Sequence, residues 1–119
     1  MLVVDDYEDT RLIYAETLRF AGFEVAEAAN GRDAIELARR INPDVVVMDL
    51  AMPVMDGWEA TRRLKSDPRT RTIPIVAVTG HDEAEHRHLA WRAGCDELYS
   101  KPLLPNQLVR RIRTCLGAA

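Results

Sequence analysis

Five short apolar segments alternate along the chain with five longer amphipathic stretches, and this alternation restricts the fold more than any other feature of the sequence. The apolar segments are rich in Val and Ile and bounded by Gly, Pro, Asn or Asp, so they predict strands at residues 2–4, 24–28, 44–48, 73–78 and 97–100. Helices are expected at residues 10–21, 30–41, 57–64, 82–93 and 108–115. Strands and helices in strict alternation form a parallel sheet with right-handed crossovers.

The central strands indicate how this sheet is covered. Residues 45–48 and 75–78 are apolar without interruption, which is typical of parallel strands with helices on both faces. The predicted fold class is therefore α/β, a (βα)5 doubly wound five-stranded parallel sheet with the flavodoxin-like order 2-1-3-4-5. One domain is expected over residues 1–119, because a chain of this length buries one core.

The helical periodicity assigns an inner face to three of the helices. The inward positions are Ile13, Thr17 and Phe20 in the first, Ala34, Ile35, Ala38 and Ile41 in the second, and Leu108, Ile112 and Cys115 in the last. Asn30 is expected to cap the second helix, because its side chain can accept a hydrogen bond from a backbone N–H of the first turn.

Composition and charge exclude several classes of function. The net charge of -3 does not suit nucleic-acid binding, which needs clustered Lys and Arg. No apolar run approaches the roughly 20 residues of a membrane span, and Asp5 and Asp6 interrupt the opening segment too soon for a secretory signal. Cys95 and Cys115 have no zinc-ligand spacing and make no disulfide framework. We therefore expect a cytoplasmic protein without direct membrane or nucleic-acid contacts.

Polar residues follow four of the five predicted strands. They are Asp5 and Asp6 after the first strand, Asp49 after the third, Thr79 after the fourth and Lys101 after the fifth. Each has an ordinary structural explanation when taken alone, since Asp forms turns, Thr suits strands and Lys is usually solvated. In a doubly wound sheet, however, ligands bind outside the carboxyl ends of the strands, where the strand order reverses. Their joint placement at this edge favours a functional site.

The acidic members of this set predict a metal ion. Carboxylates held close together repel one another unless a cation lies between them, and Mg²⁺ prefers carboxylate and carbonyl oxygens while often bridging to a phosphate. Phosphoryl transfer needs an in-line nucleophile and positive charge near the three equatorial oxygens. An Asp carboxylate can act as the nucleophile, and Mg²⁺, a Lys ammonium and a Thr hydroxyl can take up the charge.

Four motifs resemble those of one known family over essentially the whole chain. They are Leu2-Val3-Val4-Asp5-Asp6, then Val47-Met48-Asp49-Leu50-Ala51-Met52-Pro53 with Met55-Asp56-Gly57, then Val78-Thr79-Gly80, and finally Ala93-Gly94-Cys95 leading to Lys101-Pro102. Together they resemble the receiver domains of two-component response regulators. The resemblance implies that Asp49 is the phosphoacceptor and that Asp5 and Asp6 are the metal acids, with Asp6 the more direct. It also implies that the backbone carbonyl of Ala51 is a further ligand of Mg²⁺, for which Mn²⁺ could substitute.

The resemblance assigns roles at the other strand ends as well. Thr79 would bond a phosphoryl oxygen, Lys101 would pair with the phosphoryl group, and the Lys101–Pro102 bond would be cis. Two residues depart from the family pattern, which has an aromatic residue three positions before the lysine: this chain has Leu98 there and Tyr99 one place later. Strand alternation places these two side chains on opposite faces, so Tyr99 is expected to pack on the other side of the sheet rather than act as the switch aromatic.

The resemblance further implies partners. A histidine kinase or histidine phosphotransfer protein would supply the phosphoryl group, and an output protein would bind through the fourth helix, the last strand and the last helix. The chain would be a phosphoacceptor that promotes its own phosphorylation and dephosphorylation, rather than a classified enzyme. The oligomeric state stays open, as does the choice between a stand-alone regulator and a piece of a hybrid kinase or larger regulator.

Three other functions share parts of the pattern. A phosphohydrolase of the haloacid dehalogenase type needs a second acid two residues after its nucleophile, where this chain has Ala51. A flavodoxin-like flavin carrier needs a hydroxyl- and glycine-rich loop after the first strand, whereas residues 5–9 carry four acids that would repel phosphate. A degenerate receiver, acting only as an interaction module, is disfavoured by the intact acids together with Thr79 and Lys101.

Overall fold

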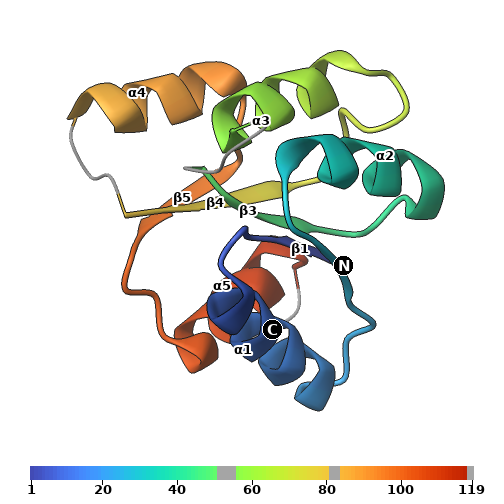
Figure 1. The fold of residues 1–119 in the computed structure, drawn as a ribbon, viewed down its shortest axis with the longest axis vertical. Helices are drawn as coiled ribbons and strands as arrows, with labels where there is room; N and C mark the ends of the chain where they lie inside the picture. Colours follow the sequence, from blue (N-terminus) through green and yellow to red (C-terminus); the bar gives the residue numbers. More distant parts are fainter. Residues whose placement is uncertain (51–55, 81–83, 118–119) are drawn as a thin grey trace.

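The computed structural model describes residues 1–50, 56–80 and 84–117, without the side chains of residues 84–86. Strands and helices alternate in this part of the chain as predicted (Figure 1). The strands are β1 (Leu2–Val4), β2 (Ala26–Ala28), β3 (Val46–Asp49), β4 (Ile75–Thr79) and β5 (Glu97–Ser100). The helices are α1 (Glu8–Phe20), α2 (Gly31–Ile41), α3 (Gly57–Ser66), α4 (Ala84–Ala93) and α5 (Pro105–Cys115). The predicted start of the fourth helix at Asp82 lies outside the described residues.

The five strands form one parallel sheet in the order β2-β1-β3-β4-β5, which confirms the predicted doubly wound topology. Leu2 of β1 pairs with Ala26 of β2 on one side and with Val46 of β3 on the other. The chain adds its second strand on one side of β1 and its later strands on the other. The strand order therefore reverses between β1 and β3, which is where such sheets bind ligands.

Two strand boundaries differ from the prediction in a way that matters for the site. β3 and β4 begin later than predicted, because the residues before them give only isolated bonds: the Val45 carbonyl accepts the Leu2 N–H at 3.0 Å and the Pro74 carbonyl accepts the Val46 N–H at 2.9 Å. At the other end, the two strands extend to include Asp49 and Thr79. Strand geometry, rather than a loop, therefore fixes the direction of these two side chains.

Helices cover both faces of the sheet, with α2, α3 and α4 on one face and α1 and α5 on the other (Figure 1). Alternate strand residues supply the two cores. Val4 and Met48 pack with residues of α2, α3 and α4, whereas Val3 and Val47 pack with residues of α1 and α5. This burial on both faces is the reason for the uninterrupted apolar runs in the sequence.

The predicted inner face of α1 is wrong. Ile13 and Phe20 are exposed by 51% and 95%, and the buried residues of this helix are Tyr14, Ala15 and Leu18. The helix carries apolar residues on two overlapping stripes, and the stripe with the small Ala15 and the long Leu18 faces the sheet. Tyr14 can be buried with them because its hydroxyl has a hydrogen-bond partner, described below.

The predicted cap and inner faces of α2 and α5 are confirmed except at one position, while α1 and α5 begin earlier than predicted, at Glu8 and Pro105. The Asn30 side chain accepts the Asp33 N–H at 2.9 Å and caps α2 as expected. Ala34, Ile35 and Ala38 of α2, and Leu108 and Ile112 of α5, are buried, with Cys115 packed beside the latter pair. Ile41 is exposed instead, because it is the last residue of α2 and the chain turns directly after it at Asn42, whose φ is 47°. Within the described residues, no helix is long and apolar enough to cross a membrane.

Candidate functional site

Three predicted carboxylates meet at the carboxyl edge of the sheet. Asp5, Asp6 and Asp49 each offer a carboxylate oxygen, and these oxygens lie within 4.8 Å of one another. Asp5 is 2% exposed and Asp49 is 6% exposed, while Asp6 is open to solvent. Asp5 and Asp49 lie side by side because β1 pairs with β3. Val4 lies opposite Met48 in this pairing, and the two acids are the next residues along each chain segment.

Lys101 brings a positive charge to this cluster. Its Nζ lies 3.5 Å from Asp5 Oδ2 and 3.4 Å from Asp49 Oδ1. Two almost fully buried carboxylates need such a partner, because uncompensated buried charge is costly. A single ammonium does not balance three carboxylates, however. The cluster therefore has the oxygen donors, spacing and negative charge to accept a divalent cation such as Mg²⁺.

The fourth strand end lies at the same edge. The Thr79 carbonyl accepts the Lys101 N–H at 2.7 Å, which fixes the start of the lysine loop against β4, and the Lys101–Pro102 bond is cis as predicted. The Thr79 side chain is fully buried. The described residues around the open pocket at this edge are Asp5, Asp6, Tyr7, Thr10, Asp49, Gly80 and Lys101. Of the predicted site residues, Ala51 lies outside the described part of the chain.

Two further contacts, which the sequence pattern did not predict, hold the acidic loop after β1. The Tyr7 N–H donates to Asp5 Oδ1 at 2.9 Å. Arg11 donates from Nη1 to the Asp5 carbonyl at 3.0 Å, and its Nε pairs with Glu27 of β2 at 3.2 Å. Arg19 also pairs with Glu27, at 3.1 Å. The sequence feature that could have pointed to these contacts was Glu27, an acid between two alanines in the short strand β2.

Tyr14 also supports the site and was not predicted, because the wrong face of α1 was assigned to the core. Its ring is buried, and its hydroxyl donates to the Leu103 carbonyl at 2.8 Å, just beyond Lys101. Burial raises the pKa of Tyr14, and the negative charges of Asp5 and Asp49 raise it further. The hydroxyl therefore stays protonated at neutral pH and keeps its role as donor.

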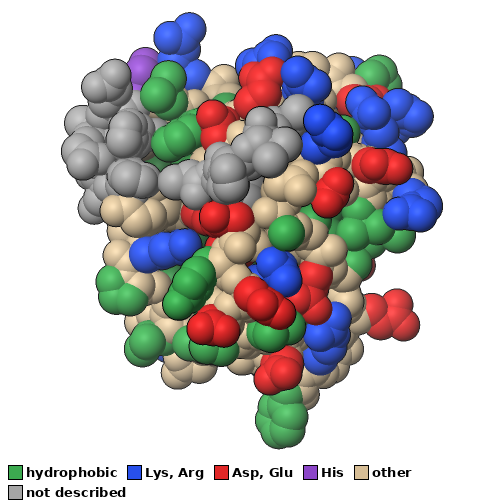
Figure 2. Space-filling model, viewed as in Figure 1, with side chains coloured by type: hydrophobic (Ala, Val, Ile, Leu, Met, Phe, Trp, Pro, Cys, Tyr) green, Lys and Arg blue, Asp and Glu red, His purple; other side chains and the backbone are tan. Residues whose placement is uncertain are grey.

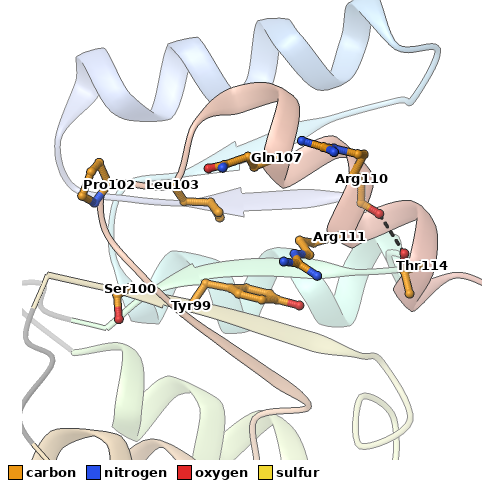
Figure 3. A pocket seen from close by; sticks show the side chains of 8 residues that line it. All are labelled: Tyr99, Ser100, Pro102, Leu103, Gln107, Arg110, Arg111 and Thr114. Carbon is orange, nitrogen blue, oxygen red and sulfur yellow. Dashed lines mark hydrogen bonds between the residues drawn. The ribbon is translucent and has the colours of Figure 1, made fainter.

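Leu98 and Tyr99 point to opposite faces, as strand alternation predicts. Leu98 packs in the core with residues of α2, α3 and α4. Tyr99 lies on the α5 side, where the Arg111 guanidinium carbon is 5.3 Å from the centre of its ring (Figure 3). Tyr99 and Arg111 line a pocket between β5 and α5. The other residues that line it are Ser100, Pro102, Leu103, Gln107, Arg110 and Thr114. Leu98 is thus the residue at the position where the family pattern has its aromatic side chain.

Acidic and basic side chains are interspersed on the face of the molecule shown in Figure 2. Within the described surface visible there, Lys and Arg do not gather into one basic patch. Many basic residues are paired locally, for example Arg63 with Glu59 at 3.0 Å and Arg39 with Asp67 at 2.8 Å. The described part of this face therefore shows no cluster of positive charge of the kind that phosphate-backbone binding uses.

The fold and the site define a flavodoxin-like domain with an acidic site at the switch point of its sheet. The model of the response regulator receiver domain family matches residues 1–113, and the chain belongs to this family of two-component signalling domains. It is 31% identical over 119 residues to the polar-differentiation response regulator DivK of Brucella anthropi, covering 100% of this chain and 97% of that protein. An uncharacterised 14.6 kDa protein of Leptolyngbya boryana is 37% identical over 118 residues, which are 98% of this chain and 90% of that protein.

Solved structures agree with this assignment. The chemotaxis protein CheY4 of Vibrio cholerae superposes with a TM-score of 0.89 at 31% identity, covering 95% of this chain and 94% of that one. The receiver domain of a sensor histidine kinase from Pseudomonas aeruginosa superposes with a TM-score of 0.90 at 30% identity, covering 98% of this chain and 96% of that one. The latter structure is described as having a magnesium ion coordinated in its active-site cleft.

Proposed function

We propose that this receiver domain accepts a phosphoryl group on Asp49 from a histidine kinase or a histidine phosphotransfer protein, in a magnesium-dependent reaction. The observation that carries the proposal is the surroundings of Asp49. This carboxylate is buried at the end of a strand, next to the carboxylates of Asp5 and Asp6 and 3.4 Å from Lys101 Nζ. A buried acid with a cationic partner at the edge of a solvent-open pocket suits a nucleophile better than a turn or a cap.

In the proposed reaction, a carboxylate oxygen of Asp49 attacks phosphorus. A new O–P bond forms, the P–O or P–N bond to the donor breaks in line with it, and the donor leaves with the electron pair. Lys101 and Thr79 would stabilise the negative charge on the equatorial oxygens. Thr79 is the last residue of β4 and is fully buried at the same edge of the sheet. The chain acts on itself, and we class it as a phosphoacceptor that promotes its own phosphorylation and dephosphorylation rather than as an enzyme.

The same residues fit a metal ion. We propose that Asp5, Asp6 and Asp49 hold Mg²⁺, with Mn²⁺ as a substitute and the Ala51 carbonyl as a further ligand. The fit rests on three carboxylate oxygens within 4.8 Å of one another, of which two belong to nearly buried residues. When bound, the ion would add its positive charge to that of Lys101, and this charge would lower the cost of bringing an anionic donor to an acidic site.

The conformational signal would pass to an output protein through α4, β5 and α5. Two features support this surface. β5 is an edge strand, and the groove beside it is lined by Tyr99, Arg110 and Arg111, with the Arg111 side chain extending toward the Tyr99 ring in Figure 3. On α4, Trp91 and Leu89 are large apolar side chains that are 48% and 43% exposed. Aromatic and Arg side chains are those enriched in protein interfaces.

We also propose that residues 1–119 act as one domain and that the protein works in the cytoplasm. The cysteines within the described residues are free, as is usual in a reducing compartment.

The proposal is tested by incubating the protein with acetyl phosphate and Mg²⁺ and measuring the intact mass. One phosphoryl group should be added, and it should be lost on mild alkaline hydrolysis, as an acyl phosphate is. Asp49→Asn removes the nucleophile with little change of shape and should gain nothing. Equal phosphorylation of this variant would place the modification elsewhere.

A further inference from the structure

Lys101 lies in a loop that has no regular secondary structure, between the end of β5 at Ser100 and the start of α5 at Pro105. Its Nζ reaches two carboxylates, yet its side chain is 30% exposed. A lysine side chain is long and has many rotamers, so packing around the side chain does not by itself fix the position of Nζ. The place of the ammonium therefore depends on how firmly the loop backbone is held.

Besides the bonds that Leu104 makes within the first turns of α5, two hydrogen bonds tie this loop to other elements, one on each side of the cis peptide bond. Before it, the Lys101 N–H donates to the Thr79 carbonyl at 2.7 Å. After it, the Leu103 carbonyl accepts the hydroxyl of Tyr14 at 2.8 Å. The first bond continues the β4–β5 ladder. The second bond comes from Tyr14 of α1, which is distant in sequence from this loop. Tyr14 thus ties the far end of the lysine loop to the core.

The surroundings of Tyr14 suit this task. Its ring is 5% exposed and packs between β1 and β3 residues and α5, so the hydroxyl is held in a fixed place. Tyr14 and Lys101 border the same apolar pocket, together with Pro102 and Leu103. The phenol also lies near enough to the acidic cluster for the charges of Asp5 and Asp49 to raise its pKa, so the donor is retained well above neutral pH.

We propose that Tyr14 is a positioning residue for Lys101: its hydroxyl holds the Leu103 carbonyl and thereby keeps the lysine ammonium between Asp5 and Asp49. The inference rests on the proposed function, since it concerns the lysine that would pair with the phosphoryl group on Asp49. The Nζ distances of 3.5 and 3.4 Å are already long for charge-assisted hydrogen bonds. A small displacement of the loop would therefore change how well the ammonium meets a phosphoryl oxygen.

Tyr14→Phe tests the proposal, because it keeps the buried ring and removes only the donor. Phosphorylation by acetyl phosphate at saturating Mg²⁺ should slow by about tenfold, the order expected when a reacting group is misplaced by a fraction of an ångström. Affinity for beryllofluoride should fall with it. Affinity for Mg²⁺ alone, measured by titration, should stay near the wild-type value, because the three carboxylates are untouched.

The matched control is Thr70→Val. Thr70 lies in the loop before β4, at the end of the sheet opposite the site, and is fully buried. Its hydroxyl donates to the Leu64 carbonyl of α3 at 2.7 Å. Both variants therefore lose one hydroxyl-to-carbonyl bond and a comparable amount of stability. Only Tyr14→Phe should slow phosphorylation. An equal slowing in Thr70→Val would show that lost stability is the cause, which would overturn the proposal.

A double-mutant comparison decides whether Tyr14 acts through the lysine. In a Lys101→Ala background, Tyr14→Phe should cause no further loss of beryllofluoride affinity, because there is no ammonium left to position. Replacing Tyr14 by para-aminophenylalanine, which keeps an N–H donor, should restore most of the rate. An undiminished effect of Tyr14→Phe in the Lys101→Ala background, or a wild-type rate in Tyr14→Phe itself, would overturn the positioning role. A wild-type protein that gains no phosphoryl group would instead overturn the proposed function itself.

Discussion

Gly57 lies directly against the backbone of Asp49. A β-carbon on Gly57 would come within 2.2 Å of the Asp49 carbonyl oxygen and within 2.6 Å of the Leu50 Cα. Gly57 is the first residue of α3, and its N–H donates to the Leu50 carbonyl at 2.8 Å. The end of β3 and the start of α3 thus meet backbone to backbone. The position of the proposed phosphoacceptor depends on a residue without a side chain.

Gly57→Ala should therefore damage both stability and the site. We expect a loss of about 1–3 kcal/mol in the free energy of unfolding, the usual cost of overpacking, and slower phosphorylation of Asp49 because its backbone must shift. Urea unfolding followed by circular dichroism measures the first effect, and intact mass after acetyl phosphate measures the second. Gly80→Ala is the control for stability, because a β-carbon there meets no atom of the described residues within 4 Å. Equal stability losses in the two variants would contradict this explanation.

Magnesium should raise the melting temperature, because it relieves repulsion among Asp5, Asp6 and Asp49. At ten times the dissociation constant, binding adds roughly 1.4 kcal/mol of stability. Asp6→Asn should act in opposite directions with and without metal. Without Mg²⁺ it should raise the melting temperature, since one like charge leaves the cluster, and with Mg²⁺ it should lose most of the metal-dependent gain.

Thermal unfolding with and without MgCl2 measures these shifts. Asp9→Asn is the matched control, because Asp9 is an exposed acid in the first turn of α1 and lies outside the carboxylate cluster. It makes the same change in net charge. If Asp9→Asn lost the magnesium gain as fully as Asp6→Asn, general screening rather than a site would explain the effect.

The proposed site was predictable from the sequence for a topological reason. In a parallel sheet all carboxyl ends lie at one edge, so the residues that end β1, β3, β4 and β5 had to lie near one another whatever the details of packing. Asp5, Asp49 and Lys101 therefore meet as predicted. Their place at one edge follows from the strand order, which the alternation of elements already restricted, whereas the final position of the Lys101 ammonium depends on the contacts of its loop.

The residues that support the site were not predictable in the same way. Tyr14 and Arg11 act through contacts with a loop and a strand that are distant in sequence, 89 and 16 residues away in the bonds to Leu103 and Glu27. Helical periodicity did not distinguish the stripe through Ile13 from the stripe through Tyr14, because both carry large apolar side chains. Only the packing of α1 against the sheet and α5 decides between them.

Asp67 should contribute to the loss of stability in acid. Its carboxylate accepts the Arg69 N–H at 2.9 Å and pairs with the Arg69 and Arg39 side chains, and these contacts lower its pKa from 3.8 to about 2. Because the folded pKa lies below the unfolded one, the unfolded chain binds more protons between these values. This stabilisation is therefore present above about pH 4 and is lost as the pH falls toward 2.

Asp67→Asn should flatten this acid limb, so that the melting temperature falls less between pH 6 and pH 3 than in the wild-type protein. Glu59, whose pKa is held at about 2 by Arg62 and Arg63, contributes to the same limb. Asp67→Asn combined with Glu59→Gln should therefore flatten it further. An unchanged slope in the double variant would mean that other carboxylates dominate acid unfolding.

The last prediction concerns how the signal leaves the site. A phosphoryl group on Asp49 should draw the Thr79 hydroxyl toward it and shift the start of α4, where Trp91 is a partly exposed reporter. Tyr99 packs on the opposite face of the sheet, against Arg111, and so should not be needed for this shift.

The experiment uses a Trp58→Phe background, in which beryllofluoride with magnesium stands in for the phosphoryl group. The Trp91 fluorescence response should persist in Tyr99→Leu and collapse in Thr79→Ala, since only the second variant removes the hydroxyl that we propose bonds a phosphoryl oxygen. A response lost in a folded Tyr99→Leu protein that still binds beryllofluoride would identify Tyr99 as the switch aromatic after all.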